Sequence, residues 1–433
     1  MRMITKDLLS FLDESTCCFT AVRNVVGRLE AAGFRRLDMS RKWPVIHEGA
    51  KYYVVKNDSA VFAFIAGNDI TAGFKIISAH SDSPCFRVKP QPEMAGGGGC
   101  LRLNTEVYGG PILYTWFDRP LSLAGRVVLR SDDPLHPVTR IVDLQEPLLV
   151  IPHLAIHFNR SVNDGNPLSK QRDMMPVLGF LKEGMEKEGL LVKVLARALE
   201  CAPGDILDFD LCLYPVEKSC LTGLDKEFIS AARIDDLEMV HAGLSALLVS
   251  AKDEPQQPMT RVLAVFDNEE TGSGTKQGAA SPVLLSVMRR LNENLGGNED
   301  TFQQAVANSF MVSADNGHGL HPNYESKQDP TNHPILGRGP VIKSNANCKY
   351  MTDADSSAVF RMICDKAGVP VQTFVNHSDV AGGSTLGNIL TSQIELRGVD
   401  MGCPQWAMHS CRETAAVADH IYTVRAFTTF YNL

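Results

Sequence analysis

Apolar residues recur at two spacings along the chain, and each spacing predicts one type of secondary structure. Near the start they recur at helical spacing, as at Val22, Val25 and Leu29, which predicts helices over residues 5–13 and 20–34. Other runs are almost wholly apolar over six to eight residues, as in "AVFAFIAG", "GFKIISAH", "RVLAVF" and "SFMVSA". Runs of this kind are typical of strands that are buried on both faces of a sheet.

The two patterns alternate in the last part of the chain. The apolar runs "VPVQTFV" and "SQIELRGV" alternate with the helical patterns "PVLLSVMRRLNENL" and "SSAVFRMICDKAG", and a last helical stretch begins at about residue 413. Strands that alternate with helices predict an α/β domain with a mixed or parallel sheet.

The middle of the chain has a different pattern. Four consecutive glycines in "QPEMAGGGGC" mark a loop or a boundary, and the strand-like runs "SLAGRVVLR", "EPLLVIPHL" and "GDILDFDLCLYP" follow with turns between them. We therefore predict a mainly β domain at residues 91–225, inserted into an α/β domain that consists of residues 1–90 and 226–433.

Composition and charge narrow the function. A chain of 433 residues is too long for one ordinary core, and 44% hydrophobic and 21% charged residues are typical of a globular protein in water. The net charge of −8 argues against nucleic-acid and anionic-membrane partners. No apolar run reaches the roughly 18 residues of a membrane-spanning helix, and the first residues do not resemble a signal peptide. Eleven cysteines without a CxxC pair favour the reducing cytoplasm.

The polar clusters follow the predicted strands. His80 and Asp82 end one strand, residues 267–270 follow another, and Asp315 follows a third. In open α/β sheets, sites form at the carboxyl ends of strands, so we expect these side chains to converge.

Convergent acids require a counter-charge. A lone Asp in such a position is more often a helix cap or half of an ion pair, but several acids and histidines together favour divalent metal ions. Imidazole and carboxylate ligands without cysteine suit zinc, manganese or cobalt. Glu269 and Glu270 are adjacent, so in an extended segment they point to opposite sides, one as a metal ligand and the other as a general base towards the substrate.

Other chemistries find less support. The sequence has no HExxH, no GxSxG and no GxxxxGK[ST]. The spacing in "GSGTKQG" is wrong for a dinucleotide-binding loop, so a tight turn accounts for it better. The stretch "GGSTLGN" fits a helix start that accepts an anion or, equally, a plain helix start.

Several long stretches resemble the aspartyl aminopeptidases, a family of dinuclear zinc metalloaminopeptidases that includes the yeast vacuolar aminopeptidase. The matching stretches are "AHSDSPCFRVKP", "YGGPILYTWFDRPLSLAGRV", "IPHLAIHFNR", "RIDDL", "FDNEETGS", "SADNGHGLHPNY", "GPVIKSNANCKY" and "PQWAMHSCRE". They follow the family order from about residue 78 to 413, and the first seventy-odd residues match only loosely.

The resemblance implies a role for each residue of the metal site. The first zinc would be bound by His80, Asp235 and Asp315, and the second by Asp235, Glu270 and His409. Glu269 would be the general base, and Asp82 would orient His80. The family usually has Asn where this chain has Asp236, which adds a negative charge. The residues alone favour a core position for His409, and only the resemblance makes it a ligand.

The resemblance also implies substrate contacts and an assembly. Lys343 would pair with an acidic substrate side chain, although the sequence alone favours a solvated lysine there. His318 and Tyr350 would contact the substrate or the tetrahedral intermediate. His157, in the inserted dimerisation domain, would reach the site of a neighbouring subunit, within dimers that build a dodecamer.

The sequence thus predicts a cytoplasmic aminopeptidase with two metal ions per subunit, zinc above cobalt or manganese, that removes N-terminal Asp or Glu from peptides. Three alternatives stay open. The first is the same chemistry with a neutral, leucine-type preference. The second is a metal-dependent deacylase or carboxypeptidase. The third is a non-catalytic assembly or cargo protein, against which the presence of Glu269 beside all the expected ligands argues.

Overall fold

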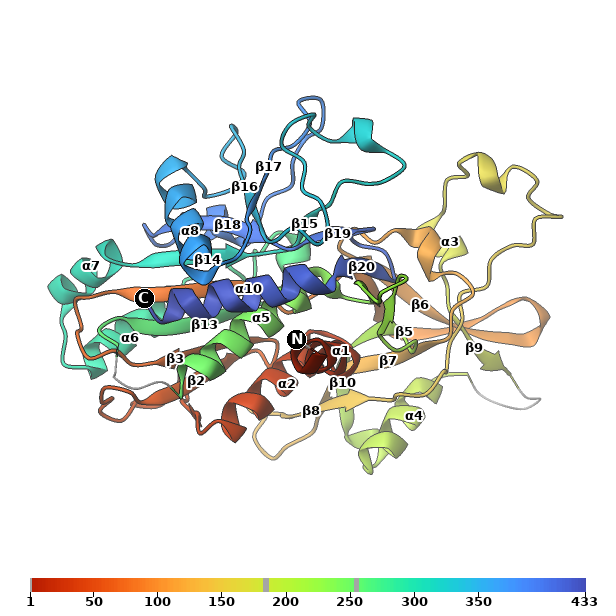
Figure 1. The fold of residues 1–433 in the computed structure, drawn as a ribbon. Helices are drawn as coiled ribbons and strands as arrows, with labels where there is room; N and C mark the ends of the chain where they lie inside the picture. Colours follow the sequence, from red (N-terminus) through yellow and green to blue (C-terminus); the bar gives the residue numbers. More distant parts are fainter. Residues whose placement is uncertain (1, 182–186, 253–256) are drawn as a thin grey trace. The chain divides into compact units, whose positions relative to one another are not determined.

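The computed structural model describes residues 2–181, 187–252 and 257–433 (Figure 1). The chain divides into two compact units. The first consists of residues 1–82, 219–408 and 413–433, and the second of residues 83–218 and 409–412. The predicted borders were 90/91 and 225/226, so the second unit starts and ends earlier by this division and includes a short segment from near the end of the chain.

A nine-stranded mixed sheet forms the centre of the first unit, in the order β1-β2-β3-β13-β4-β14-β18-β16-β17. β4 runs parallel to β13 and β14, whereas β13 runs antiparallel to β3. The strands are β1 (Arg35–Arg36), β2 (Lys51–Lys56), β3 (Ala60–Ile65), β4 (Phe74–His80), β13 (Thr260–Phe266), β14 (Phe310–Ala314), β16 (Val341–Lys343), β17 (Gln372–Phe374) and β18 (Arg397–Gly402).

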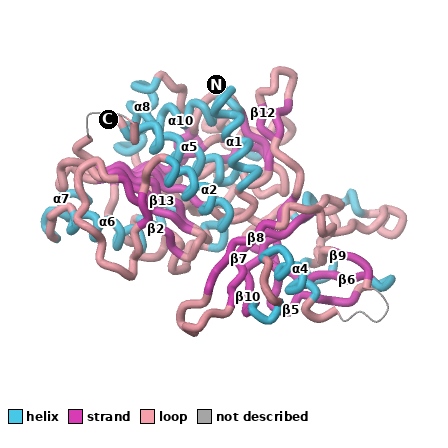
Figure 2. The backbone as a smooth tube through the Cα atoms, turned by 90° about the horizontal axis from the view of Figure 1, so that it is seen from below, coloured by secondary structure: helices cyan, strands magenta, loops and turns pink. Residues whose placement is uncertain are grey.

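Helices cover both faces of this sheet, as Figure 2 shows. One face packs against α1 (Arg2–Glu14), α2 (Cys18–Ala31), α5 (Ile234–Ser250), α8 (Ala354–Ala367) and α10 (Val417–Tyr431). The other packs against α6 (Val283–Asn294), α7 (Glu299–Ala307) and α9 (Leu386–Leu390).

Successive residues of one strand enter these two cores. Leu263 and Val265 of β13 face the α5 and α10 side, and Val262 and Ala264 face the α6 side. A strand covered on both sides favours apolar residues at most positions, which explains "VLAVF" after the buried Arg261. The predicted α/β mixed-sheet fold is thereby confirmed.

A smaller sheet in the first unit has the strand order β11-β12-β20-β19-β15. It consists of β11 (Cys220–Thr222), β12 (Phe228–Ala231), β15 (Gly317–His318), β19 (Pro404–Trp406) and β20 (Glu413–Ala416). The last helix was expected from about residue 413. It begins at Val417 instead, because residues 413–416 pair with β12.

The second unit is built on a six-stranded antiparallel sheet in the order β8-β7-β10-β5-β6-β9. Its elements are β5 (Cys85–Ala95), β6 (Cys100–Tyr108), β7 (Leu121–Leu129), β8 (Val138–Asp143), α3 (Lys170–Asp173), β9 (Val177–Phe180), α4 (Leu190–Leu199) and β10 (Ile206–Pro215). The glycine run lies in the turn between β5 and β6, where Gly98 and Gly99 have φ of 66° and 73°. Glycine adopts such left-handed conformations without a steric penalty.

Short 3₁₀ helices complete the description: η1 (Gly97–Gly99), η2 (Leu113–Trp116), η3 (Val162–Asp164), η4 (Pro203–Asp205), η5 (Glu269–Thr271) and η6 (Glu325–Lys327). Among the described residues, no helix has both the length and the apolar character needed to cross a bilayer.

Candidate metal centre

Three neighbouring parallel strands bring the predicted polar residues to one edge of the large sheet. His80 is the last residue of β4 and pairs with Phe266, the last residue of β13. β14, on the other side of β4, ends at Ala314, directly before Asp315. α5 begins at Ile234 and carries Asp235 in its first turn. The predicted convergence at the carboxyl ends of strands is therefore present in the first unit.

Two groups of potential ligands share His80. In each group every residue offers one ligand atom, and these atoms lie within 4.8 Å of one another. The first group is His80, Asp235, Asp236 and Asp315, and the second is His80, Glu269 and Glu270. Nε2 of His80 lies 3.4 Å from Oδ1 of Asp235 and 4.0 Å from Oε2 of Glu269.

Asp82 holds the two segments of this cluster together. Its Oδ1 accepts a hydrogen bond from the backbone N–H of Glu269 at 3.1 Å, and its Oδ2 accepts one from that of Glu270 at 3.1 Å. Oδ1 also lies 3.3 Å from Nδ1 of His80. A buried carboxylate in this position fixes both the imidazole ring and the backbone of the two glutamates.

Glu269 and Glu270 do not lie in an extended segment. They open the 3₁₀ helix η5, and both offer an oxygen to the group around His80. The expectation that they point to opposite sides was wrong, because it assumed the period of two that holds only for extended chain.

Asp236 is a member of the cluster that the sequence did not assign. It is fully buried, and its Oδ2 accepts the backbone N–H of His80 at 3.0 Å. The peptide bond between Asp235 and Asp236 is cis. This carboxylate oxygen stands where the Asn expected from the family resemblance would offer an amide oxygen to the same N–H group. The only available signal was its position next to Asp235.

Burial and crowding of the carboxylates in the cluster raise their pKa values. Burial, Asp315 and Asp82 together raise the pKa of Glu269 to about 8, against the opposing effect of His80. Burial and the neighbouring carboxylates likewise raise the pKa of Glu270. Burial lowers the pKa of the His80 imidazole, but Asp236, Asp235 and Asp82 outweigh it and raise that pKa well above its ordinary value. A cation among these oxygens would relieve the repulsion.

The predicted substrate residues Lys343, Tyr350 and His318 also lie in the first unit. Lys343 is buried, and its Nζ lies 3.5 Å from Oδ2 of Asp315 and donates to the carbonyl oxygen of Asn316 at 2.8 Å. The same Nζ lies 5.8 Å from the ring centroid of Tyr350, which is also buried. His318 is exposed on β15, with its ring 6.1 Å from that of Phe374. The expectation from the sequence alone, a solvated lysine at 343, was wrong.

His157 and His409 belong to the second unit. His157 is exposed in a turn. His409 has a positive φ of 67°, and its Nδ1 lies 3.1 Å from the carbonyl oxygen of Gly110. Their assignments to a neighbouring site and to the second metal remain predictions.

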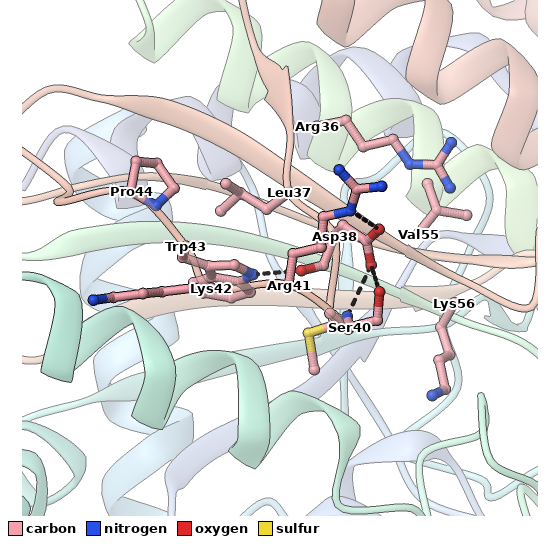
Figure 3. A pocket seen from close by; sticks show the side chains of 11 residues that line it. Arg36, Leu37, Asp38, Ser40, Arg41, Lys42, Trp43, Pro44, Val55 and Lys56 are labelled. Carbon is pink, nitrogen blue, oxygen red and sulfur yellow. Dashed lines mark hydrogen bonds and ion pairs between the residues drawn. The ribbon is translucent and has the colours of Figure 1, made fainter.

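A separate pocket of about 810 Å³ in the first unit contains none of these residues (Figure 3). It is lined by residues 36–44 and by Val55 and Lys56, and the basic side chains of Arg36, Lys42 and Lys56 point in different directions in the close-up. The pocket and the acid cluster are therefore distinct features of the first unit.

Comparisons with known proteins cover almost the whole chain. Residues 11–431 match the model of a family described as Aminopeptidase I zinc metalloprotease (M18). A Clostridium novyi protein named as a probable M18 family aminopeptidase 2 is 48% identical over 429 residues, which are 99% of this chain and 98% of that protein. Ape4, solved in a complex with Nbr1, is 35% identical with a TM-score of 0.95, over 99% of this chain and 85% of that chain. The S. cerevisiae mApe1 dodecamer, 24% identical over 99% of this chain and 96% of that chain, has the same fold with a TM-score of 0.87.

Proposed function

Because the chain belongs to the M18 family of zinc aminopeptidases, we propose that it removes N-terminal Asp and Glu residues from peptides by means of two zinc ions. The observation that carries this proposal is the buried group of His80 and carboxylates at the strand ends, with the buried cation of Lys343 beside it. The family membership argues against a deacylase and a carboxypeptidase. The presence of Glu269 beside the candidate ligands argues against a non-catalytic cargo protein. The preference for acidic residues is the finer part of the proposal.

The donor set fits zinc. His80, Asp235 and Asp315 would hold the first ion, and Asp235, Glu270 and His409 the second. All are imidazole or carboxylate ligands, and the acids of the first unit are crowded enough to raise one another's pKa. Zinc bound here would lower the pKa of a water molecule and polarise the scissile carbonyl group.

Glu269 is the residue that moves the proton. It takes a proton from the attacking water and delivers it to the leaving amine. Asp82 accepts hydrogen bonds from the backbone N–H groups of Glu269 and of the candidate ligand Glu270. The backbone that carries the Glu269 side chain is therefore fixed within the cluster. Tyr350 and His318 contact the substrate or the tetrahedral intermediate in this scheme.

Lys343 supports the acidic preference as the buried cation next to Asp315. Burial lowers its pKa, but Asp315 and the other surrounding charges outweigh this effect and raise it, so the side chain stays charged. An acidic substrate side chain would share this ammonium group. The runner-up is a neutral preference, which the existing ion pair with Asp315 favours because it already balances the charge of the lysine.

The second unit serves assembly in this proposal. It is a mainly β insertion between residues 82 and 219, and we propose it as a dimerisation domain that presents His157 to the neighbouring subunit. Dimers would then build a homo-oligomer, and a dodecamer is the form of the yeast mApe1 structure.

The test is a panel of Asp-, Glu- and Leu-p-nitroanilides assayed with zinc, cobalt and manganese, next to the same compounds with blocked amines. We expect hydrolysis of the free-amine compounds only, with the acidic ones fastest. Faster cleavage of Leu would support the neutral preference. Cleavage of blocked substrates, but not free ones, would contradict an aminopeptidase.

A further inference from the structure

A chain of polar side chains, buried except for Asp7, leads through the first unit to the residue that follows Asp315. Its members are Asp7 of α1, His241 and Glu238 of α5, His420 of α10, and Asn316. The links are His241 Nε2 to Asp7 Oδ2 at 2.8 Å, His241 Nδ1 to His420 Nε2 at 3.0 Å, His420 Nδ1 to Glu238 Oε1 at 3.6 Å, and Asn316 Nδ2 to Glu238 Oε2 at 2.7 Å.

Burying these polar side chains costs folding free energy, so we expect them to have a function. Glu238 and His241 are fully buried, and His420 and Asn316 are 1% and 2% exposed. Only Asp7 is substantially exposed, and it pairs with Arg28 at 2.8 Å. A buried carboxylate is destabilising unless hydrogen bonds and charges compensate it, and apolar residues of similar volume often serve stability as well or better.

Donor and acceptor chemistry gives the chain a direction. The Asp7 carboxylate can only accept, so Nε2 of His241 carries a hydrogen and its neutral ring accepts through Nδ1. Nε2 of His420 must then donate to His241, and Nδ1 of His420 lies 3.6 Å from Oε1 of Glu238 without a hydrogen bond between them. The hydrogen-bonded chain from Asp7 therefore ends at His420, and Glu238 is bound by the amide of Asn316 instead.

On its other side, Glu238 anchors Asn316. The Asn316 amide donates to Glu238 and, at 3.2 Å, to the carbonyl oxygen of Cys403. The backbone carbonyl oxygen of Asn316 accepts from Nζ of Lys343, which also lies beside Asp315. One asparagine therefore connects Glu238 to the backbone of Asp315 and to the ammonium group of Lys343.

We propose that Glu238 is a positioning residue of the metal centre, which fixes Asp315 and Lys343 through Asn316. Glu238 lies on α5, so this helix contributes to the geometry of Asp315, a ligand that it does not carry. This inference rests on the proposed function, because it takes Asp315 as a metal ligand.

The experiment measures the dissociation constant of zinc in stripped protein, by competition with a chromophoric chelator, together with the melting temperature. Glu238→Ala and Asn316→Ala should each weaken zinc binding by about 10-fold or more, as loss of a residue that orients a ligand usually does. The double variant should be no weaker than the worse single variant, because both act through one contact. Glu238→Gln keeps an acceptor for Asn316 and should bind zinc within about 3-fold of the wild type.

Val240→Ala is the matched control. Val240 is buried on α5, two residues and thus about 200° around the helix from Glu238. It should lower the melting temperature without weakening zinc binding. If Asn316→Ala and Glu238→Ala also lower only the melting temperature, the network is structural and the inference is wrong. Should Glu238→Ala fail to fold, Asn316→Ala alone decides between these results.

Asp315→Ala distinguishes an error in the assignment of Asp315 as a ligand from an error in the positioning role of Glu238. Weak zinc binding in Asp315→Ala beside wild-type binding in Asn316→Ala overturns the positioning role alone. Wild-type binding in Asp315→Ala overturns the ligand assignment and the inference with it.

Discussion

The two large sheets of the molecule bury their residues differently. Every residue of β4, β13 and β14 is buried, because helices cover both faces of the nine-stranded sheet. In the six-stranded sheet, β5 and β8 mix buried with half-buried and exposed positions. The first pattern is that of parallel strands in an α/β core, and the second is that of an antiparallel sheet with one solvated side.

This difference in burial places most of the candidate metal ligands in the first unit and an exposed apolar connection in the second. Parallel strands end at a common edge, so residues as distant in sequence as His80 and Asp315 meet in one buried cluster. The antiparallel unit joins its strands by local turns and long connections, and one connection exposes Leu154, Ile156 and Phe158 by 56%, 45% and 81%. We therefore expect variants in the first unit to change catalysis and metal binding, and variants around His157 to act between subunits.

Metal removal should have the largest effect. Stripping the protein with a chelator should abolish activity, and zinc, cobalt or manganese should restore it, because the water needs a metal to become a nucleophile near neutral pH. Hydrogen exchange sharpens the comparison: zinc should increase protection at residues 80–82 and 267–271 but not in the glycine turn at 96–99. Full activity at less than about 0.1 metal ion per chain would contradict the account.

His157→Phe should come next, with almost complete loss of activity but unchanged zinc binding. His136→Phe, also exposed in the second unit, is the control and should remain active. Mixed dimers of His157→Phe with Glu269→Gln contain one site with both residues intact, so part of the activity should return. No recovery in isolated mixed dimers, beside active wild-type dimers, would mean that His157 does not complete a neighbouring site.

Lys343→Leu should have a selective effect. Loss of a buried cation from a carboxylate costs on the order of a few kcal/mol, so Asp and Glu substrates should lose about 100-fold more in kcat/KM than Leu substrates. Lys75→Leu removes another buried lysine, whose Nζ donates to the carbonyl oxygen of Tyr431, and should leave the substrate ratio unchanged. Equal losses on all substrates in Lys343→Leu would mean that Lys343 does not determine the substrate preference.

The smallest predicted effect is on stability and comes from His241. Burial lowers the pKa of His241 from 6.5 to about 4. The unfolded chain therefore binds a proton that the folded protein does not, and stability is complete above pH 6.5 and declines as the pH falls towards 4. The loss is roughly 3 kcal/mol at pH 4 from this group, by the energy of one pKa unit.

Melting temperatures between pH 4 and 7 test this sign. His241→Gln should flatten the decline, whereas His136→Gln, at an exposed histidine, should not. A protein that becomes more stable on acidification from pH 6.5, or a His241→Gln variant with an unchanged slope, would contradict the effect of burial.

The apolar runs made most of the first unit predictable. "GFKIISAH" and "RVLAVF" correspond to β4 and β13, and the helical patterns near residues 283 and 356 correspond to α6 and α8. Continuous apolar runs carry this information because burial on both faces favours apolar residues at successive positions. The strand at 413–416 was not predictable, since four residues paired with a distant partner leave no periodic signal.

The site was predictable as residue types but not as geometry. Strand ends indicated His80, Asp82 and Asp315, whereas the shared direction of Glu269 and Glu270 depends on the local 3₁₀ turn of η5. The partners of Lys343 and the contact between Glu238 and Asn316 come from residues 27 to 78 positions apart. Contacts of this range depend on how helices pack on the sheet, which a single sequence does not specify.

The central claim is that the buried cluster holds zinc and that Glu269 is the base beside it. The most direct test measures zinc content and kcat in the same samples of the wild type, Glu269→Gln and Glu270→Gln. We predict two zinc ions per chain in the wild type and in Glu269→Gln, with kcat lower by orders of magnitude in the latter because Gln cannot accept the proton. Glu270→Gln should instead bind zinc weakly. Zinc lost from Glu269→Gln and kept by Glu270→Gln, or wild-type turnover in Glu269→Gln, would contradict the account.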